Sequence, residues 1–438
     1  MQPRAKSDRL GAAGERSALA LLSTAEAAEL DRRAIAAGLE GTALMERAGA
    51  AVADAAARMT PQGGSIVILC GPGKNGGDGF VAARVLAASG FRVRLALVGD
   101  RGALSGDAAV VAERFAGASV PLEPGVLADA GLVVDAIFGA GLSRNIDEPV
   151  AAVIAALNGL GLPVLAADVP TGIDGSTGAV RGIAVRASRT LTFCRRKPGH
   201  LLLPGRVHCG PVTVADIGIP SGIVDALEVK TFANAPALWL PVLPIPSLDG
   251  HKYDRGHAIV VSGPIESTGA ARLAARAALR IGAGVVTVAS PGTALAVNAA
   301  HLTAVMVRRC DGAASLAALL ADDRITAIAL GPGLAGAAEF EGEGGAPVRS
   351  MVVAALAGRS AVVLDADALT AFAGKVDELA TGIGANPRRP VVLSPHDGEY
   401  RRLFGDVGGS RLDRARHAAE AAGTIVVAKG SDTVIAAP

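Results

Sequence analysis

Short apolar runs alternate with amphipathic segments along most of the chain. In the first half, four runs are predicted to be strands, at 66–70, 92–98, 132–137 and 164–168. Segments with helical spacing of apolar residues lie between or after them, at 79–88, 106–115 and 149–157. Continuous apolar runs are typical of strands covered on both faces of a parallel sheet. The pattern therefore predicts an α/β fold for this half of the chain.

Two features frame this first α/β region. Residues 24–57 carry helical periodicity, with Ser23 or Thr24 as the expected N-cap and with Gly38 and Gly41 dividing the stretch into two helices. At the other end, apolar runs at 189–194 and 211–215 follow one another without a helical segment between them. We therefore expect these last two strands to be antiparallel at one edge of the sheet.

A second α/β region begins near residue 257. Six strands are expected there, at 257–262, 285–289, 326–330, 361–365, 391–394 and 424–429. Three helices are expected, at 270–281, 347–357 and 411–422. The segment 236–246 contains four prolines and is predicted to be an extended linker. The expected organisation is a flexible start at 1–18, a first domain at 19–220, a linker at 221–248 and a second domain at 249–438.

Composition limits the classes of function. Basic and acidic residues are nearly balanced, 42 against 41 among 438, so neither a nucleic-acid surface nor a membrane surface is indicated. Aromatic residues are only 3%, so the cores must consist of Ala, Val, Leu and Ile. The four cysteines are widely spaced and are expected to be reduced thiols. The N-terminal residues contain no apolar signal segment, and the longest apolar stretch is broken by Gly and Pro. A cytoplasmic protein is expected.

The richest chemistry lies in the segment 65–90. A strand is followed by the glycine-rich sequence GPGKNGGDGF and then by helical spacing from Phe80. Glycines let the backbone approach a phosphate, and the first N–H groups of a helix point toward it. Lys74, Asn75 and Asp78 add a cation, an amide and a carboxylate. The spacing is neither GxGxxG nor GxxxxGK[ST], so a nucleotide site of a less common kind is indicated.

Two further strand ends carry polar groups. Asp135 closes one apolar run and precedes the loop 139–145, and Asp168 closes the next and precedes the turn Pro170–Gly172. An Asp after a strand often serves only as a turn or helix cap. Ligands of open parallel sheets, however, bind at the carboxyl ends of the strands. Because three polar strand ends are expected at one edge, we predict a binding site there.

The motifs NGGDG, VDAIFG and DVPTGID, preceded by LMERAG, resemble the epimerase domain of the bifunctional NAD(P)H-hydrate repair enzymes over about residues 19–220. The resemblance implies a Rossmann-like three-layer sandwich that binds hydrated nicotinamide nucleotide, NAD(P)HX. The residues implied to line that substrate are Lys74, Asn75, Gly76, Gly77, Asp78, Gly139, Ala140, Gly141, Leu142, Ser143, Arg144, Asn145 and Asp168. The residues implied to bind a potassium ion, K+, are Asn75, Asp135 and Thr171.

Two positions depart from the usual pattern of that family. The family commonly has Asn where this chain has Lys74, and Ser where it has Thr171. The second change keeps the hydroxyl, whereas the first replaces a neutral amide by a cation. The substrate of the family is a hemiaminal with a hydroxyl at C6 of the reduced ring. A single carboxylate, here Asp168, can protonate the leaving hydroxyl and then deprotonate the water that attacks. The potassium ion suits oxygen ligands, and it serves either the reaction or only the structure of the strand ends.

The second region resembles the dehydratase domain of the same enzymes, a ribokinase-like fold. Six segments match in order, namely HKYDRGHAIVVSG, TGAARLAARAALRIGAGVVTVA, LGPGL, VLDADAL, LSPHDGEYRRLFG and VAKGSDTVIA. The resemblance implies that Ala270, Gly333 and His396 contact the hydrated dinucleotide. It implies that ADP, with Mg2+, binds at Lys429, Gly430, Ser431, Asp432 and Thr433. ADP then phosphorylates the hydroxyl, which leaves as phosphate.

The family pattern continues into a GxGD turn that does not occur after residue 433 here. We therefore expect a ribokinase-like domain that lacks its C-terminal part and dehydrates slowly or not at all. Two alternatives stay open: a small-molecule kinase of the ribokinase type, and a nucleotide-binding protein without catalysis. A homo-oligomer is expected, because ribokinase-like folds and these repair enzymes often assemble.

Overall fold

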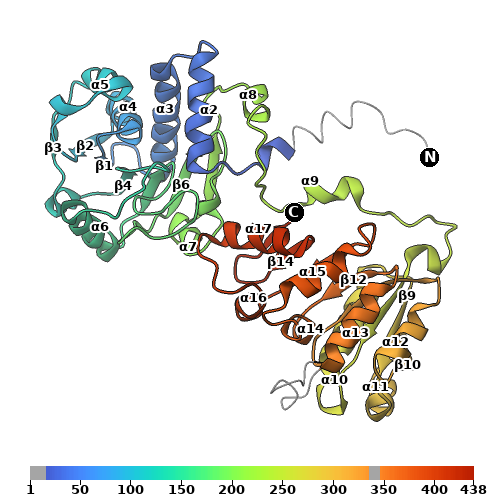
Figure 1. Cartoon of the computed structure of the whole chain (residues 1–438). Coiled ribbons are helices and arrows are strands. Elements are labelled where there is room, and N and C mark those ends of the chain that lie inside the picture. Colours follow the sequence, from blue (N-terminus) through green and yellow to red (C-terminus); the bar gives the residue numbers. More distant parts are fainter. Residues whose placement is uncertain (1–15, 335–345) are drawn as a thin grey trace. The chain divides into compact units, whose positions relative to one another are not determined.

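The computed structural model describes residues 16–334 and 346–438. The chain divides into two compact units, Met1–Leu243 and Pro244–Pro438 (Figure 1). The division lies within the segment 221–248 that was expected to link two domains. Of the flexible start expected at 1–18, residues 1–15 lie outside the described residues.

The first unit contains a seven-stranded sheet in the order β3-β2-β1-β4-β5-β6-β7. Every neighbouring pair of these strands is parallel. The strands are β1 Ser65–Cys70, β2 Arg92–Leu97, β3 Ser119–Pro121, β4 Leu132–Ala136, β5 Val164–Ala167, β6 Arg189–Phe193 and β7 Val212–Ala215. The helices are α2 Thr24–Ala36, α3 Gly41–Met59, α4 Lys74–Ala88, α5 Gly106–Glu113, α6 Glu148–Leu160, α7 Gly205–Cys209 and α8 Ser221–Asp225.

Helices cover both faces of this sheet, which confirms the three-layer sandwich (Figure 1). Successive side chains of a strand point to opposite faces. Ile66 and Ile68 of β1 accordingly pack in a core with Phe80 of α4. Val67 and Leu69 of the same strand pack in a second core with Val153, Ile154 and neighbouring residues of α6. The predicted break between two N-terminal helices is confirmed, and Ser23 caps α2 in a capping box with Glu26.

Two expectations for this unit are wrong. Strands β6 and β7 are parallel, not antiparallel. The crossover between them contains a 3₁₀ turn at Pro198–His200 and the five-residue helix α7, and both are too short to leave an amphipathic pattern. Helix α4 begins at Lys74, so the glycines from 76 to 79 lie inside the helix and not in a turn before it. A Cβ on Gly76 would lie 1.8 Å from the carbonyl oxygen of Gly71, so these glycines permit close packing of the helix.

The proline-rich segment also differs from the expectation. In its first part, Pro236–Trp239 forms the short helix α9 and a 3₁₀ turn at Leu240–Val242 follows, whereas residues 244–246 have no regular secondary structure. Proline is compatible with the first turn of a helix, because its missing N–H has no partner there in any case.

The second unit contains an eight-stranded sheet in the order β10-β9-β8-β11-β12-β13-β14-β15, in which only β15 is antiparallel to its neighbour. Its strands are β8 His257–Val261, β9 Val285–Ser290, β10 Met306–Arg309, β11 Ile325–Leu330, β12 Ala361–Leu364, β13 Val391–Leu393, β14 Ile425–Ala428 and β15 Val434–Ala436. Its helices are α10 Thr268–Ile281, α11 Leu295–His301, α12 Ala313–Leu320, α13 Ala346–Ala357, α14 Asp367–Thr370, α15 Val376–Gly384, α16 Asp397–Phe404 and α17 Arg411–Ala422.

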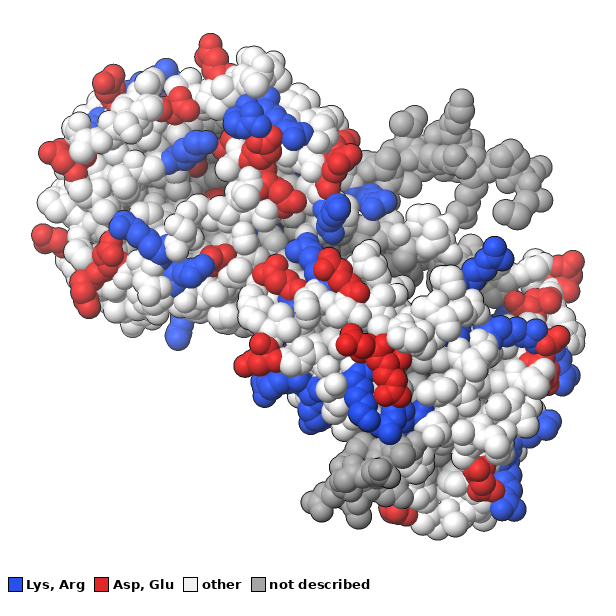
Figure 2. Space-filling model, viewed as in Figure 1, with Lys and Arg blue, Asp and Glu red and all other residues white. Residues whose placement is uncertain are grey.

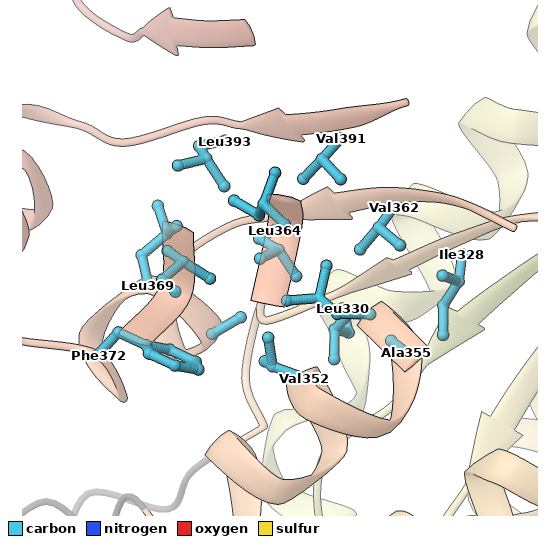
Figure 3. Packing of buried hydrophobic residues seen from close by; sticks show 14 of the residues in the cluster. Ile328, Leu330, Val352, Ala355, Val362, Leu364, Leu369, Phe372, Val391 and Leu393 are labelled. Atoms are coloured by element: carbon cyan, nitrogen blue, oxygen red, sulfur yellow. The ribbon is translucent and has the colours of Figure 1, made fainter. Parts of the chain in front are cut away.

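The core of this unit is aliphatic, as its composition required. Figure 3 shows Ile328 and Leu330 of β11 packed with side chains of β12 and β13 and with Val352 and Ala355 of α13. Phe372 is the one aromatic residue among those labelled there. Strand β10 was not predicted from the sequence. Its residues, MVRR, are exposed or half-buried at the sheet edge, so they do not form an apolar run.

Figure 2 shows Lys and Arg interspersed with Asp and Glu over the visible face of each unit. All four cysteines are buried and free, as expected. Within residues 16–334 and 346–438, no helix combines the length and the hydrophobicity needed to cross a membrane.

Candidate active site

A cavity of about 560 Å3 opens at the carboxyl edge of the first sheet. Its polar wall comes from the start of α4, the loop after β4 and the ends of β5 and β6, whereas α2 and α3 supply much of an apolar wall. Of the residues predicted to contact substrate, those that line the cavity are Lys74, Asn75, Asp78, Gly139, Ala140, Gly141, Leu142, Ser143, Arg144 and Asp168. Gly76 and Gly77 are instead buried in helix packing, and Asn145 is exposed outside the lining.

The carboxylate of Asp168 is fixed in place on this wall. Its Oδ1 accepts hydrogen bonds from the ammonium of Lys197 at 2.5 Å and from the hydroxyl of Thr192 at 2.9 Å. Its Oδ2 accepts the backbone N–H of Ala140 at 2.9 Å. The backbone of Asp168 has a φ of 65°, a conformation that non-glycine residues rarely adopt and that is found often at functional sites. These hydrogen bonds and the backbone conformation fix the orientation of the side chain.

The surroundings keep Asp168 ionised. Burial alone would raise its pKa, but the charge and hydrogen bond of Lys197, together with the Ala140 N–H, outweigh burial and lower the pKa. Lys197 is itself 4% exposed, so the two charges form a buried ion pair. A carboxylate held in this state is ready to accept a proton.

His200 forms hydrogen bonds with the backbone of both Lys197 and Asp168. Its Nδ1 accepts the backbone N–H of Lys197 at 2.9 Å, and its Nε2 lies 2.8 Å from the backbone oxygen of Asp168. Burial lowers the pKa of His200 to about 4, with Lys197 adding to the effect. The imidazole is therefore neutral near pH 7, with the proton on Nε2 and donated to the Asp168 carbonyl.

Lys197 and His200 were missed by the sequence analysis. They stand in the segment FCRRKPGH directly after β6. A signal existed, since this strand also ends at the carboxyl edge of the sheet.

A second carboxyl group, that of Asp78, lines the same cavity and is 7% exposed. Burial raises its pKa well above the ordinary value, and the nearby charges of Asp168 and Asp31 raise it further. The ammonium groups of Lys74 and Lys197 act in the opposite direction but do not prevail. Lys74 is paired with Asp31 at 2.9 Å at the exposed rim.

The three predicted potassium ligands lie at the ends of the adjacent strands β1, β4 and β5. Asp135 is fully buried, and its carboxylate accepts the N–H and the hydroxyl of Thr171 at 2.8 and 2.6 Å. Burial raises the pKa of Asp135 to about 6 against these hydrogen bonds. Both polar atoms of the Asn75 side chain are buried without a hydrogen-bond partner. An unpaired amide, a buried carboxylate and a hydroxyl fit a cation that prefers oxygen ligands.

In the second unit, the predicted residues fall in two groups at the carboxyl edge of its sheet. Gly333 accepts a hydrogen bond of 2.7 Å from Ser267, which precedes the helix α10 that carries the exposed Ala270. His396 is the N-cap of α16, and its Nε2 lies 3.2 Å from the carboxylate of Glu399.

Glu399 interacts both with His396 and with Lys429, one of the residues predicted to bind the nucleotide. It is 5% exposed and lies 4.0 Å from the ammonium of Lys429, which also forms an ion pair with Asp365. Arg411 donates to the backbone oxygen of Lys429 at 2.5 Å and pairs with Asp432 at 3.3 Å. Thr433 donates to the carbonyl of Gly430 at 3.2 Å, while Ser431 lies between them in the same turn. Asp365, Glu399 and Arg411 were not predicted.

Comparisons with known proteins match both units. Residues 41–199 match the family described as YjeF-related protein N-terminus, and residues 258–438 match NAD(P)H-hydrate dehydratase. A Salinibacter ruber protein named bifunctional NAD(P)H-hydrate repair enzyme Nnr is 37% identical over 92% of this chain and 78% of its own length. The Coxiella burnetii protein of the same name is 33% identical over 93% and 81%.

Among solved structures, a Bacillus subtilis ADP/ATP-dependent NAD(P)H-hydrate dehydratase co-crystallised with ATP and Mg2+ is 31% identical. The match covers 45% of this chain and 65% of that chain, with a TM-score of 0.37. The identities over nearly the whole chain, together with the matches of both units, establish that this chain belongs to the family of bifunctional NAD(P)H-hydrate repair enzymes.

Proposed function

We propose that the first unit interconverts the (R) and (S) epimers of NAD(P)HX at C6, and that the second unit dehydrates the (S) epimer to NAD(P)H at the expense of ADP. The observation that carries the first assignment is the ionised carboxylate of Asp168, held by Lys197 on the wall of a cavity. Its position at the carboxyl edge of a parallel sheet is where such folds bind ligands.

The chemistry requires a group that moves protons at a cavity wall. The hydroxyl at C6 leaves with assistance from the lone pair of the ring nitrogen, which produces an iminium ion. Water then adds to C6, and a base takes the extra proton. Asp168 is suited to this last step because it is ionised and immobilised by three hydrogen bonds. Its negative charge also favours the cationic ring that forms during the reaction.

Binding of the dinucleotide is assigned to the rim and loop around this carboxylate. Lys74 and Arg144 line the cavity, and their side chains are 67% and 70% exposed, so both can reach the phosphates of a dinucleotide. The loop Gly139–Arg144 contributes backbone at the same edge. A potassium ion would be held by Asn75, Asp135 and Thr171, and its chemistry would be to supply positive charge beside the buried Asp135.

For the second unit, we assign the adenine nucleotide to Lys429–Thr433 and the hydrated dinucleotide to Ala270, Gly333 and His396. The contacts among Lys429, Glu399 and His396 support this assignment, because they bring the two groups to one sheet edge. Mg2+ is assigned to the nucleotide, since phosphoryl transfer from ADP requires neutralisation of its charge.

The test is a direct assay of both reactions. The purified protein is incubated with a mixture of (R)- and (S)-NADHX in potassium buffer, and the epimer ratio is followed by chromatography. We expect rapid interconversion that is lost in Asp168→Asn and retained in Asp54→Asn, a carboxyl on the exposed face of α3. Lack of interconversion by the folded wild type would refute the epimerase assignment.

Dehydration is followed at 340 nm after addition of ADP and Mg2+. Lys429→Met is expected to abolish any recovery of NADH while leaving epimerisation intact. The wild-type rate in this assay tests whether the second unit dehydrates its substrate slowly or at a normal rate.

A further inference from the structure

Asp78 is a buried carboxyl group that the proposed reaction does not yet use. It lies one turn into α4, which follows β1, whereas Asp168 follows β5. Strand β4 lies between these two strands, so the strand axes are about 10 Å apart at the usual spacing. Both carboxyl groups line the same cavity. They therefore approach its interior from two different strand ends.

The two carboxyl groups have contrasting surroundings. Asp168 accepts three hydrogen bonds, one of them from a buried ammonium group. Among the described residues, no side chain or backbone group donates a hydrogen bond to the Asp78 carboxyl. The charged groups around Asp78 are two carboxylates, Asp31 and Asp168, and two ammonium groups, Lys74 and Lys197. The buried thiol of Cys70 is also close enough for the charge of Asp78 to add to the effect of burial and raise the pKa of that thiol.

Inversion at C6 poses a requirement that Asp168 alone does not meet. The hydroxyl must leave from one face of the ring, and water must attack the other. Asp168 begins the reaction ionised, so it has no proton to give to the departing hydroxyl. A proton donor at a second position is therefore needed.

We propose that Asp78 and Asp168 form an acid–base pair, in which the Asp78 carboxyl protonates the departing C6 hydroxyl on one face of the ring and the Asp168 carboxylate takes a proton from the water that attacks the other face. This proposal rests on the epimerase function proposed above. The first step breaks the C6–O bond, releases water and leaves Asp78 ionised. The second step forms a new C6–O bond and leaves Asp168 protonated.

The protonation states are consistent with these roles. Burial and neighbouring carboxylates raise the pKa of Asp78, whereas Lys197 lowers that of Asp168. Two carboxyl groups whose environments drive their pKa values apart are the usual pattern of an acid and a base in one site. After one inversion the roles are exchanged, so the site is then prepared for the opposite epimer. Exchange of protons with water resets it.

The first test is the variant Asp78→Asn, which keeps the shape of the side chain but removes its proton-donating function. We expect kcat for epimerisation to fall by about 10²- to 10⁴-fold, with KM little changed. Asp54→Asn serves as the control, and circular dichroism and Tm verify folding. A folded Asp78→Asn enzyme with the kcat of the wild type would overturn the proposal. That result would leave the epimerase assignment intact, provided that the wild type epimerises NADHX in the same experiment.

The pH profile of the wild type is a second test that does not depend on any variant folding. At fixed KCl, kcat/KM should fall at alkaline pH as Asp78 loses its proton, and this alkaline limb should be absent from Asp78→Asn. A wild-type profile without an alkaline limb, or one that persists in the variant, would contradict the role of Asp78.

Oxygen exchange distinguishes a pair from a single carboxylate. In Asp168→Asn, Asp78 still protonates the hydroxyl and can return water to the same face. The variant should then incorporate ¹⁸O from labelled water into one NADHX epimer without inverting it, at a rate above that without enzyme. Loss of exchange together with inversion would contradict independent action of Asp78.

Discussion

The ammonium of Lys197 lies 2.5 Å from Oδ1 of Asp168, and the two side chains are 5% and 15% exposed. In a buried pair, each charge depends on the other, because neither can be solvated by water. The pair fixes both the protonation state and the position of the proposed base.

Removal of this cation by Lys197→Met should impair both catalysis and stability. Burial of Asp168 would then be opposed chiefly by the Ala140 N–H, its pKa would rise, and the acid limb of kcat/KM for epimerisation would move to higher pH. Breaking a buried pair from one side costs about 3–5 kcal/mol in the free energy of unfolding.

Lys74→Met provides the comparison for stability, since its ion pair with Asp31 is exposed and contributes about 1 kcal/mol or less. Chemical unfolding and the pH profile are the measurements. An unshifted acid limb in folded Lys197→Met would show that Lys197 does not control Asp168.

The sequence predicts one member of this pair, Asp168, but not the other, Lys197. The positions of Asp135 and Asp168 were predictable, because each ends an apolar run and parallel strands end at one edge. Lys197 is 29 residues from Asp168 in the sequence, and only the parallel pairing of β5 with β6 brings them together. The sequence analysis took β6 and β7 for an antiparallel edge, so it gave no reason to examine the segment after β6.

The glycines of α4 show a second limit. Glycine-rich sequence usually indicates a turn, and that rule placed the helix start five residues too late. A Cβ on Gly77 would lie 2.4 Å from the sulfur of Met45, and one on Gly79 would lie 2.6 Å from the sulfur of Cys70. Such tertiary packing leaves no periodic pattern in the sequence, whereas the apolar strands do.

The neutral state of His200 predicts a specific pH dependence of stability. Its pKa is about 4 in the folded protein against 6.5 as the ordinary value. The unfolded chain therefore binds more protons between these values, and stability should fall as pH decreases from about 6.5 to 4. The total loss is on the order of 3 kcal/mol. The free energy of unfolding of the wild type and of His200→Gln is measured with denaturant at several pH values between 4 and 6.5. It should depend less on pH in the variant, and an equal dependence in both proteins would refute the interpretation.

Gly139→Ala should reduce epimerisation through displacement of the base. A Cβ at this position would lie 2.9 Å from Oδ2 of Asp168 and 3.3 Å from the amide of Asn75. A displacement of about 1 Å at a reacting group costs about 10²-fold in rate. Gly159→Ala, where a Cβ has open space, is the control. Steady-state kinetics of both variants test this, and equal rates would show that the space at Gly139 is dispensable.

Potassium should stabilise the first unit if Asn75, Asp135 and Thr171 bind it. Binding to the folded state alone adds about 2.7 kcal/mol when the ion is at 100 times its Kd. We expect a higher Tm in KCl than in N-methylglucamine chloride at equal ionic strength, and loss of this difference in Asn75→Ala. The same Tm in both salts would argue against a potassium site.

The most direct measurement starts from a single epimer. Purified (S)-NADPHX is incubated with the wild type in KCl without ADP, and the appearance of the (R) epimer is followed by chromatography beside Asp168→Asn and an enzyme-free sample. The account predicts that the wild type brings the epimers to equilibrium far faster than the enzyme-free sample, while Asp168→Asn does not. Equilibration by the folded wild type at the enzyme-free rate, or at the same rate in both proteins, would contradict it.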